Sequence, residues 1–523
     1  INLGINTAYA VTGGAVVHIL DSYKNNGGKI IFFHHEQSAS FAVSSHYKTS
    51  GNIACCMVTS GPGVTNAITG LASAWLDSIP AIFISGQSRL NSLVGDREGM
   101  RQSGNQEVIT KDFVEGACKK FFMPRKADDL ESILHEAIEL TKNGRPGPVW
   151  IDIPLDIQWS EIDKPVIINN SKLHNIDNKK LDLSRLKTDL IKSKKPIFLL
   201  GAGIKTFNAE KELDKLLSAV NIPVLTTWGA IGLIDEEDKL YCGRPGPAGQ
   251  RGANKILLES DLIISIGSHM RSQVIGPTGV KDLSQTLIYV IHVDPDEDKY
   301  SNLIKRNFIF SDAKLFIDSF LKELEKEEII NRENWLNLSK NYHYLDSSKE
   351  KINDLEDRVD PYKLIEYISK TFKGMCNYVV DGGGTVTAMC MQALKVAKGQ
   401  NIVLSSALTP MGTGLPESVG SACASEIPVI TFIGEGSFQF NIQELATIKY
   451  HNYKVFVILI DNGGYLSIKN TIGQFLEGRN LGVGIDSGLC FPNAEYIAKA
   501  YGFEYLKITS NNKLFKIKEA FLK

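Results

Sequence analysis

The sequence predicts an α/β protein with three doubly wound parallel-sheet domains. Its 523 residues suggest about three domains of roughly 150 residues each. Short apolar runs, rich in β-branched residues and bounded by glycine or proline, alternate along the chain with longer helical patterns. Alternating strands and helices imply parallel sheets that are covered by helices on both faces.

The alternation divides into three segments, which gives domains at residues 1–165, 183–326 and 358–523. The expected strands are KIIFFHH, IACCMVTS, PAIFISG and PVWIDIP in the first, KPIFLLGAG, IPVLTTWG, DLIISIG and LIYVIHVDPD in the second, and NYVVDGGG, NIVLSS, PVITFIGEG, VFVILIDNGG and FEYLKI in the third. A polar linker is expected at residues 169–180. The chain stops in a helical pattern, KLFKIKEAFLK, so we expect the C-terminal edge of the third domain to be missing.

Composition excludes several classes of protein. The charged fraction is 22% and the formal net charge is −2, which argues against a nucleic-acid or membrane-surface partner. No apolar run reaches the ~18 residues that a transmembrane helix needs. The eight cysteines are scattered and form no CxxC pair, which is typical of free thiols in a reducing, cytoplasmic setting.

Two glycine-rich turns in the third segment carry oxygen ligands. Gly434-Glu435-Gly436-Ser437 and Asp461-Asn462-Gly463-Gly464 each follow an expected strand. Carboxylate and amide oxygens suit a Mg²⁺ ion, which takes its other ligands from water and phosphate. Glycines let backbone N–H groups approach a diphosphate, and Ser437 opens a helix whose N-terminus favours anions. Taken singly, each turn is more often structural.

Together the two turns resemble the thiamine diphosphate motif, a GDG followed at a fixed interval by NN. Glu435 and Asn462 are 27 positions apart, the interval that the motif has, and the intervening FQFNIQELATIKYHN is also similar to the family. The resemblance implies that Glu435 and Asn462 are side-chain ligands of Mg²⁺, with the carbonyl of Gly464 as a third. Glu435 replaces the usual Asp, and Asp461 the first Asn, so the ion is expected to shift or the loop to relax.

The first segment resembles the pyrimidine-binding domain of acetolactate synthases. His35-Glu36-Gln37 follows a strand, and Gly61-Pro62-Gly63-Val64-Thr65-Asn66 comes 25 positions later, before LASAWLDSIPAIFISGQ. The resemblance implies that Glu36 bonds N1′ of the aminopyrimidine. Protonation there makes the 4′-amine acidic, and a buried carboxyl is a suitable proton partner.

Two further stretches complete the implied cofactor site. Ala407-Leu408-Thr409-Pro410-Met411-Gly412 resembles the family segment that supplies the wedge between the two cofactor rings. Met411 is therefore the expected wedge, and the carbonyl of Thr409 the acceptor for the 4′-amine. Gly384 and Thr385, within Asp381-Gly382-Gly383-Gly384-Thr385, together with Gly436 and Ser437, are expected to contact the diphosphate.

The resemblance covers nearly the whole chain as pyrimidine-binding, central and diphosphate-binding domains. In the family the cofactor lies between the first domain of one subunit and the third of its partner. A homodimer or homotetramer is therefore expected, with Glu36 and Glu435 of one site on different chains. The central segment reads Gly267-Ser268-His269-Met270-Arg271-Ser272 where the family holds FAD; this match is partial, and FAD is not favoured.

Residues on the substrate side suggest which member of the family this is. Gly14 and Ala15 match the pyruvate-side loop, and Asn105-Gln106-Glu107 matches the active-site loop, in which Gln106 is the candidate catalytic residue. Acetolactate synthases have a Trp where this chain has Thr471, which would open the pocket for a bulkier acceptor. The stretch around Arg101, a candidate for binding a phosphate or carboxylate, looks more like the branch linked to surface-polysaccharide synthesis.

Three functions follow as hypotheses. The first is an enzyme that decarboxylates a small 2-oxo acid, with pyruvate favoured, and transfers the acyl unit to a carbonyl acceptor such as a nucleotide-linked keto-sugar. Acetolactate synthesis, in which the acceptor is a second 2-oxo acid, is the alternative within this class. The second is a simple decarboxylase that releases an aldehyde. The third is a homologue without catalytic activity. Glu36 argues against it, because a protein that does not catalyse the reaction needs no residue to relay a proton.

Overall fold

The computed structural model describes residues 1–95, 99–162, 181–276, 279–296, 306–325, 330–350 and 357–522. It divides into two compact units. The first unit comprises Ile1–His174, Asn377–Val386 and Val403–Tyr505, and the second comprises Asn175–Cys376, Thr387–Ile402 and Leu506–Lys523. The expected linker at residues 169–180 lies outside the described residues.

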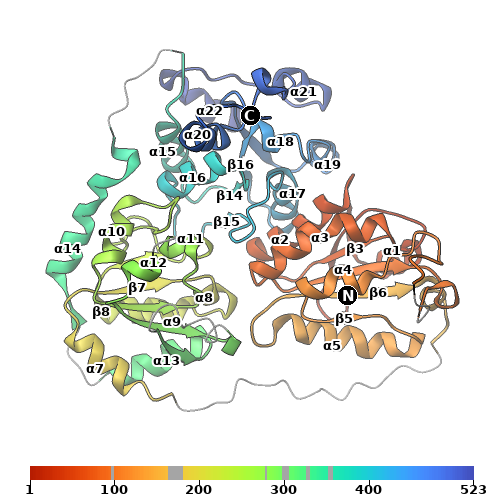
Figure 1. Ribbon diagram of the computed structural model, residues 1–523, viewed down its shortest axis with the longest axis horizontal. Coiled ribbons are helices and arrows are strands. Elements are labelled where there is room, and N and C mark those ends of the chain that lie inside the picture. The colour runs from red at the N-terminus through yellow and green to blue at the C-terminus, as the bar shows by residue number, and fades with distance from the viewer. Residues whose placement is uncertain are drawn as a thin grey trace. The chain divides into compact units, whose positions relative to one another are not determined.

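A parallel sheet forms the N-terminal part of the first unit (Figure 1). Its order is β2-β1-β3-β4-β6-β5. The strands are β1 (Thr7–Ala10), β2 (Lys29–Phe32), β3 (Cys55–Val58), β4 (Ala81–Gln87), β5 (Phe121–Phe122) and β6 (Pro148–Pro154), and the helices are α1 (Val17–Asn25), α2 (Glu36–Ser50), α3 (Pro62–Leu76), α4 (Thr110–Val114), α5 (Leu130–Lys142) and α6 (Leu155–Gln158).

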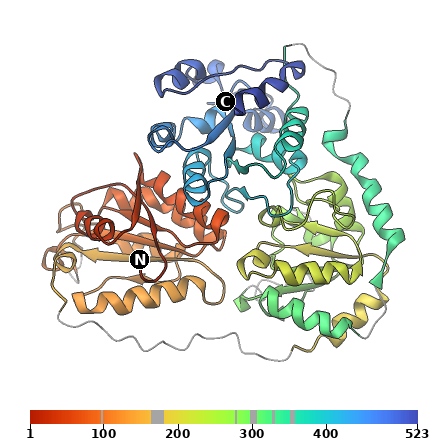
Figure 2. The same ribbon diagram turned by 180° about the vertical axis from the view of Figure 1, so that it is seen from behind.

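Alternate residues of these strands enter two different cores. In β3, Cys56 and Val58 pack with side chains of α2 and α3, whereas Cys55 and Met57 pack with side chains of α1 and α5. Side chains point alternately to the two faces of a strand, so both faces of this sheet are buried under helices, as Figures 1 and 2 show. This is the doubly wound arrangement that the sequence predicts.

A second parallel sheet of order β15-β14-β16-β17 lies in the C-terminal part of the chain. The strands are β14 (Asn377–Val380), β15 (Ile402–Val403), β16 (Val429–Gly434) and β17 (Val455–Ile460), and the helices are α16 (Gly384–Ala393), α17 (Gly414–Ala424), α18 (Glu435–Phe438), α19 (Glu444–Tyr450), α20 (Leu466–Phe475) and α21 (Ala494–Ala500). The stretch FEYLKI, expected as a strand, is irregular and mostly exposed, so that prediction is wrong.

Helices α2 and α17 join the two sheets of the first unit into one body. Gly420 on α17 lies so close to α2 that a Cβ there would be 2.0 Å from Ser45 Oγ. Beside this contact the hydroxyl of Tyr9 bonds Nδ1 of His46 at 2.7 Å. Leu415 and Val419 of α17 share a hydrophobic core with Ala39 and Val43 of α2. Residues far apart in sequence therefore meet where α2 packs against α17.

The second unit holds the third parallel sheet, of order β12-β11-β10-β7-β9. Its strands are β7 (Pro196–Leu200), β9 (Val224–Thr226), β10 (Leu262–Ile266), β11 (Leu287–His292) and β12 (Arg306–Phe310), with β8 (Val220–Asn221) and β13 (Ile330–Asn331) paired separately. The helices are α7 (Ser184–Lys192), α8 (Gly203–Thr206), α9 (Glu210–Ser218), α10 (Arg251–Glu259), α11 (Ser272–Ile275), α12 (Gly279–Asp282), α13 (Ala313–Leu324), α14 (Glu333–Asn341), α15 (Pro361–Thr371) and α22 (Phe515–Phe521). The three parallel sheets confirm the predicted fold class.

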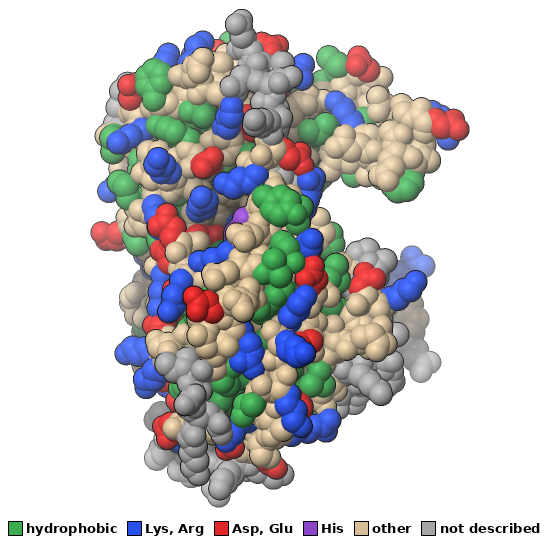
Figure 3. Space-filling model, turned by 90° about the vertical axis from the view of Figure 1, so that its left-hand side faces the viewer, with side chains coloured by type: hydrophobic (Ala, Val, Ile, Leu, Met, Phe, Trp, Pro, Cys, Tyr) green, Lys and Arg blue, Asp and Glu red, His purple; other side chains and the backbone are tan. Residues whose placement is uncertain are grey.

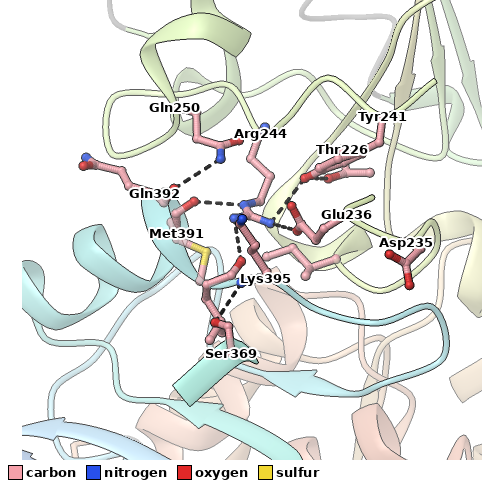
Figure 4. A network of polar contacts seen from close by, with 12 residues as sticks. Thr226, Asp235, Glu236, Tyr241, Arg244, Gln250, Ser369, Met391, Gln392 and Lys395 are labelled. Atoms are coloured by element: carbon pink, nitrogen blue, oxygen red, sulfur yellow. Dashed lines mark hydrogen bonds and ion pairs between the residues drawn. The ribbon is translucent and has the colours of Figure 1, made fainter. Parts of the chain in front are cut away.

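A fully buried arginine organises the second unit (Figure 4). Arg244 donates from Nε to the carbonyl of Met391 at 2.9 Å and from Nη2 to the carbonyl of Leu394 at 2.8 Å. Its Nη1 bonds Glu236 and Tyr241. Carbonyls at the end of a helix lack intrahelical partners, so Arg244 satisfies the C-terminal end of α16 while Glu236 balances its charge.

The surface and the thiols agree with the composition. Basic and acidic side chains are intermixed over the face shown in Figure 3. Within the described ranges no helix combines the length and the apolar character needed to span a bilayer. All eight cysteines are free thiols; Cys490 is exposed, Cys423 is half-buried and the other six are buried.

Candidate active site

Glu36 is the first residue of α2, directly after the turn that follows β2. The imidazole Nδ1 of His35 accepts a hydrogen bond from the backbone N–H of Gln37 at 3.3 Å and so caps this helix. Oε2 of Glu36 accepts a hydrogen bond from the side-chain amide of Asn66 at 3.0 Å. The Glu36 side chain is half-buried rather than buried as expected, so it is both oriented and accessible.

Asn441 links the start of α2 to the segment that carries Thr409 and Met411. Its Oδ1 accepts from the hydroxyl of Ser38 at 2.9 Å, and its Nδ2 donates to the carbonyl of Gly412 at 2.8 Å. Thr409 has a φ of 51°, a left-handed conformation that is uncommon for a residue other than glycine. The structure therefore brings Glu36, Thr409 and Met411 to the same region of the first unit.

Asp381, the residue directly after β14, organises the glycine-rich loop before α16. Its carboxylate accepts from the backbone N–H of Gly383 at 3.0 Å, from that of Gly414 at 2.8 Å, and from the hydroxyl of Ser437. Burial raises the pKa of Asp381, whereas these hydrogen bonds lower it. The loop that leads to Gly384 is thus tied to the start of α17 and to the Glu435 turn.

Gly384 and Ser437 occupy different surroundings. Gly384 begins α16 and is exposed, and a Cβ there would lie 2.7 Å from Ser467 Oγ of α20. Ser437 is buried, and its hydroxyl is engaged because it donates to Asp381 and accepts from the N–H of Gly412 at 2.9 Å. A diphosphate contact through the Ser437 hydroxyl would have to replace one of these bonds.

The two halves of the expected metal site meet. The Glu435 carboxylate accepts from the backbone N–H of Asn462 at 2.6 Å and from that of Gly464. Burial raises the pKa of Glu435, the two N–H groups lower it, and the neighbouring carboxyl of Asp461 raises it. A carboxylate from one turn, with a side-chain amide and a backbone carbonyl from the turn beside it, forms the hard oxygen set that Mg²⁺ binds, so these residues fit the ion.

Gly436 is explained by packing. A Cβ at this position would be 2.1 Å from the ring of Tyr465, which follows the Asp461–Gly464 turn. Only glycine allows the Glu435 turn and the Asp461 turn to approach each other this closely. Gly436 therefore brings Glu435 to the loop of Asn462, whatever contact its backbone makes with a cofactor.

The donor-side residues surround the turn after β3. The backbone N–H of Ala15 donates to Oγ1 of Thr59 at 3.4 Å, and Gly14 has open space where a Cβ would stand. A Cβ on Gly61 would lie 2.5 Å from the carbonyl oxygen of Gln106. Ala15 and Gln106 thus lie against opposite ends of the Thr59–Gly61 turn.

The remaining predicted substrate residues are exposed. Arg101 lies on the surface, as does Thr471, whose hydroxyl donates to the carbonyl of Ser467 one turn earlier in α20 at 3.1 Å. Asn66 and Asn441 were not identified as site residues from the sequence, although both belong to stretches that resemble the family. An asparagine in such a stretch offers no signal of its own, because only the folded chain shows which groups it connects.

Comparison with known proteins identifies the family. Models of the thiamine pyrophosphate enzymes match in chain order: the N-terminal TPP-binding domain over residues 1–112, the central domain over 183–320, and the C-terminal TPP-binding domain over 382–523.

Curated relatives match along nearly the full length. The acetolactate synthase large subunit of Buchnera aphidicola subsp. Schizaphis graminum is 30% identical and aligns with 98% of this chain and 89% of its own. The corresponding large subunit of Lactococcus lactis is 29% identical over 97% of this chain and 86% of its own. The chain therefore belongs to the family of thiamine-pyrophosphate-dependent enzymes, as a homologue of acetolactate synthase large subunits.

Proposed function

We propose that the protein decarboxylates pyruvate and joins the acetyl unit to the carbonyl group of a second 2-oxo acid, as acetolactate synthases do. The observation that carries this proposal is the similarity to acetolactate synthase large subunits over 98% of the chain. A simple decarboxylase would protonate the acyl unit instead. The similarity to acetolactate synthase large subunits supports this alternative less than it supports carboligation.

Thiamine diphosphate and Mg²⁺ are the proposed cofactors. When bound, thiamine diphosphate supplies the electron sink that allows a 2-oxo acid to lose CO₂ and its acyl carbon to act as a nucleophile. Glu435, Asn462 and the carbonyl of Gly464 would hold the metal ion, a role that agrees with the meeting of Glu435 and the Asn462 loop. Gly384 and Thr385, at the start of α16, are proposed to contact the diphosphate.

Glu36 is proposed to hold a proton at N1′ of the pyrimidine ring. The bond from Asn66 supports this role, because it fixes one carboxylate oxygen and leaves the other for the ring nitrogen. Thr409 would accept the 4′-amine through its carbonyl, and Met411 would keep the two rings bent. The bond from Nδ2 of Asn441 to the carbonyl of Gly412 supports these roles, since it fixes the backbone next to Met411.

Gln106, with Gly14 and Ala15, is proposed to bind the small 2-oxo acid donor. The two loops share the Thr59–Gly61 turn, so a donor that occupies one loop lies near the other. The open space around the Gly14 Cβ position leaves room for a substrate beside this loop.

A second candidate acceptor is a bulkier hydroxylated carbonyl compound, such as a nucleotide-linked keto-sugar. The observation that favours it is Thr471, a short and exposed side chain on α20 where acetolactate synthases have the larger Trp. Arg101, exposed as well, would bind the phosphate or carboxylate of an acceptor.

The site is proposed to be complete in a homodimer or a homotetramer, with Glu36 of one subunit serving the cofactor held by Glu435 of the partner subunit. A cytoplasmic location agrees with the six buried thiols.

Product analysis tests the function. Purified protein is incubated with pyruvate, thiamine diphosphate and Mg²⁺, alone and with a panel of 2-oxo acids and nucleotide-linked keto-sugars, and products are identified by mass. Acetolactate from pyruvate alone is the expected result, and acetaldehyde as sole product with every acceptor would overturn it. A parallel incubation with FAD, followed by desalting and absorbance, tests whether flavin binds, which the partial match at residues 267–272 does not favour.

The variant Thr471→Trp separates the two acceptors. Filling this space should weaken use of a keto-sugar and leave donor decarboxylation largely intact. If Thr471→Trp changes product yield equally with every acceptor, Thr471 has no part in acceptor choice.

A further inference from the structure

The loop that carries Gln106 is held by a buried carboxylate outside the proposed chemistry. Glu107 is 5% exposed. Its Oε1 accepts from the backbone N–H of Val94 at 2.7 Å, and its Oε2 accepts from those of Ser103 at 3.0 Å and Gly104 at 2.7 Å. Hydrogen bonds to a charged acceptor are roughly twice as strong as neutral ones, so this side chain ties two separate stretches of backbone together.

The same turn is closed by further bonds. The N–H of Glu107 donates to the carbonyl of Gly104 at 3.2 Å, and Nε2 of Gln102 donates to the carbonyl of Glu107 at 3.0 Å. The hydroxyl of Ser88 donates to the carbonyl of Asn105 at 2.8 Å. Residues 102–107 therefore form a turn whose backbone is held from several sides.

Gln87 anchors the chain just beyond the turn. Its Nε2 donates to the carbonyl of Val108 at 3.1 Å and to Oδ2 of Asp152 at 3.0 Å, and its Oε1 accepts from the N–H of Ser88 at 2.9 Å. Asp152 is itself buried and accepts from Ser85 Oγ at 2.6 Å. The chain that leaves the turn is thus fixed to Gln87, the last residue of β4, which is itself held by Asp152 of β6.

Within this turn Gln106 has a strained backbone. Its φ is 55°, in the left-handed region that side-chain-bearing residues rarely adopt and that persists only where the surroundings enforce it. Its carbonyl oxygen would be 2.5 Å from a Cβ on Gly61, the residue directly before α3, the helix from which Asn66 reaches Glu36. A backbone in this state presents the exposed Gln106 side chain in a direction that a relaxed loop would not.

We propose that Glu107 is a positioning residue, which holds the left-handed conformation of Gln106 against Gly61 and thereby places the Gln106 side chain for the 2-oxo acid donor. The proposal rests on the donor-binding role of Gln106. Glu107 does not contact the substrate itself, because it is buried and its two oxygens already accept three backbone N–H groups.

The test compares Glu107→Gln with Asp261→Asn. Gln keeps the length of the side chain but has only one acceptor oxygen, so either Val94 or the Ser103–Gly104 pair loses its partner. Asp261 is a matched control: its carboxylate also accepts from two consecutive backbone N–H groups, those of Lys194 at 2.8 Å and Lys195 at 3.0 Å, but in the second unit. Both variants should lower the melting temperature.

Steady-state kinetics with pyruvate give the first result. Glu107→Gln should lower kcat/KM about 10- to 100-fold, since misplacing a binding group by about 1 Å can cost 10²-fold, while the dissociation constant for thiamine diphosphate with Mg²⁺ stays within about twofold. Asp261→Asn should leave kcat/KM unchanged. Equal kinetic losses in the two variants, or a parallel loss of cofactor affinity in Glu107→Gln, would overturn the proposal.

Two further measurements keep the proposal testable if one variant fails to fold or if pyruvate is not a substrate. Gly61→Ala pushes on the Gln106 carbonyl from the other side and should reproduce the kinetic loss; unchanged kinetics contradict the proposal. Hydrogen–deuterium exchange of the peptide spanning residues 99–110 needs no turnover. Faster exchange in Glu107→Gln supports the role of Glu107 in holding the loop, and unchanged exchange overturns it. If the wild-type protein forms no product, the proposed function is refuted. The exchange measurement still tests the positioning role of Glu107, because it does not depend on activity.

Discussion

The side-chain amide of Asn66, in the second turn of α3, donates a hydrogen bond of 3.0 Å to Oε2 of Glu36, the first residue of α2 and 30 positions earlier in the chain. An amide can only donate from its nitrogen, so this contact fixes which carboxylate oxygen faces α3 and which faces away. Asn66 is therefore the group that orients the predicted proton partner of the cofactor.

Replacing Asn66 by leucine should lower kcat about tenfold and leave cofactor affinity unchanged, because the carboxyl stays present but loses its orientation. Asn66→Asp should be worse, since a second carboxylate would repel Glu36. Equal rates for Asn66→Leu and wild type would show that the bond has no catalytic consequence.

Glu36→Gln should bind thiamine diphosphate nearly normally and lose roughly 10²- to 10⁴-fold in rate, the usual contribution of a general acid–base group. Gln occupies the same space but cannot exchange a proton with N1′ in the same way. NMR of C2 proton exchange in the bound cofactor is the direct measurement, and wild-type exchange in the variant removes Glu36 from the mechanism.

Glu435→Ala should weaken metal-dependent binding of thiamine diphosphate about tenfold or more, as loss of a metal-site group commonly does. Calorimetric titration with Mg²⁺ and cofactor measures the effect. Glu426→Ala, an exposed carboxylate that follows α17, is the control and should bind normally. Unchanged affinity in Glu435→Ala would place the metal elsewhere.

Glu417 makes stability depend on pH. Its side chain on α17 is fully buried. Burial raises the pKa of Glu417 to about 8; Lys48 and the Thr413 hydroxyl lower it, and Asp381 and Asp77 raise it. The unfolded chain has an ordinary carboxyl pKa of about 4.3, so between about pH 4.3 and pH 8 the folded state binds more protons than the unfolded state.

The free energy of unfolding of the wild type should accordingly contain a term from Glu417 that falls by about 1.4 kcal/mol for each pH unit over this window and is constant above it. Glu417→Gln removes the term. Urea denaturation at pH 5 and at pH 8 should show a variant whose advantage over wild type grows with pH. An advantage that is the same at both pH values contradicts the assignment.

Arg244→Met should destabilise the second unit by roughly 3–5 kcal/mol, because it leaves the buried Glu236 unpaired and the carbonyls of Met391 and Leu394 without donors. Arg244→Met combined with Glu236→Gln should recover part of this loss, since the unpaired charge is gone. Denaturant titration of both proteins is the measurement, and a double variant no more stable than the single one would show that the carbonyls alone account for the effect.

Sequence patterns predicted the strands that carry strong local signals and missed those that depend on context. Runs such as PVITFIGEG are apolar and β-branched, and β16 forms there. The strand β1 lies between β2 and β3, yet its sequence TAYA is short and rich in alanine, so only its position in the sheet makes it a strand. FEYLKI alternates as an edge strand should, but it pairs with no strand in the described structure.

The same limit applies to the site. Glu36, Glu435 and Asn462 were predicted because they belong to motifs with a fixed spacing. Asn441 and Asp381 act by joining backbone groups from distant stretches, and a side chain with that role has no characteristic neighbours in sequence. Such organising residues become visible only when hydrogen-bond partners are known.

The division of the first unit between the two ends of the chain has a consequence for synthesis on the ribosome. The helix α2 emerges early, but its partner α17 follows only after most of the second unit, including Asn175–Cys376, has been made. At 5–20 residues per second, translation of the 363 residues between the end of α2 and the start of α17 takes about 20–70 s. During that interval the apolar face of α2 that later covers α17 is exposed on the nascent chain, so we expect newly made protein to need a chaperone there more than elsewhere.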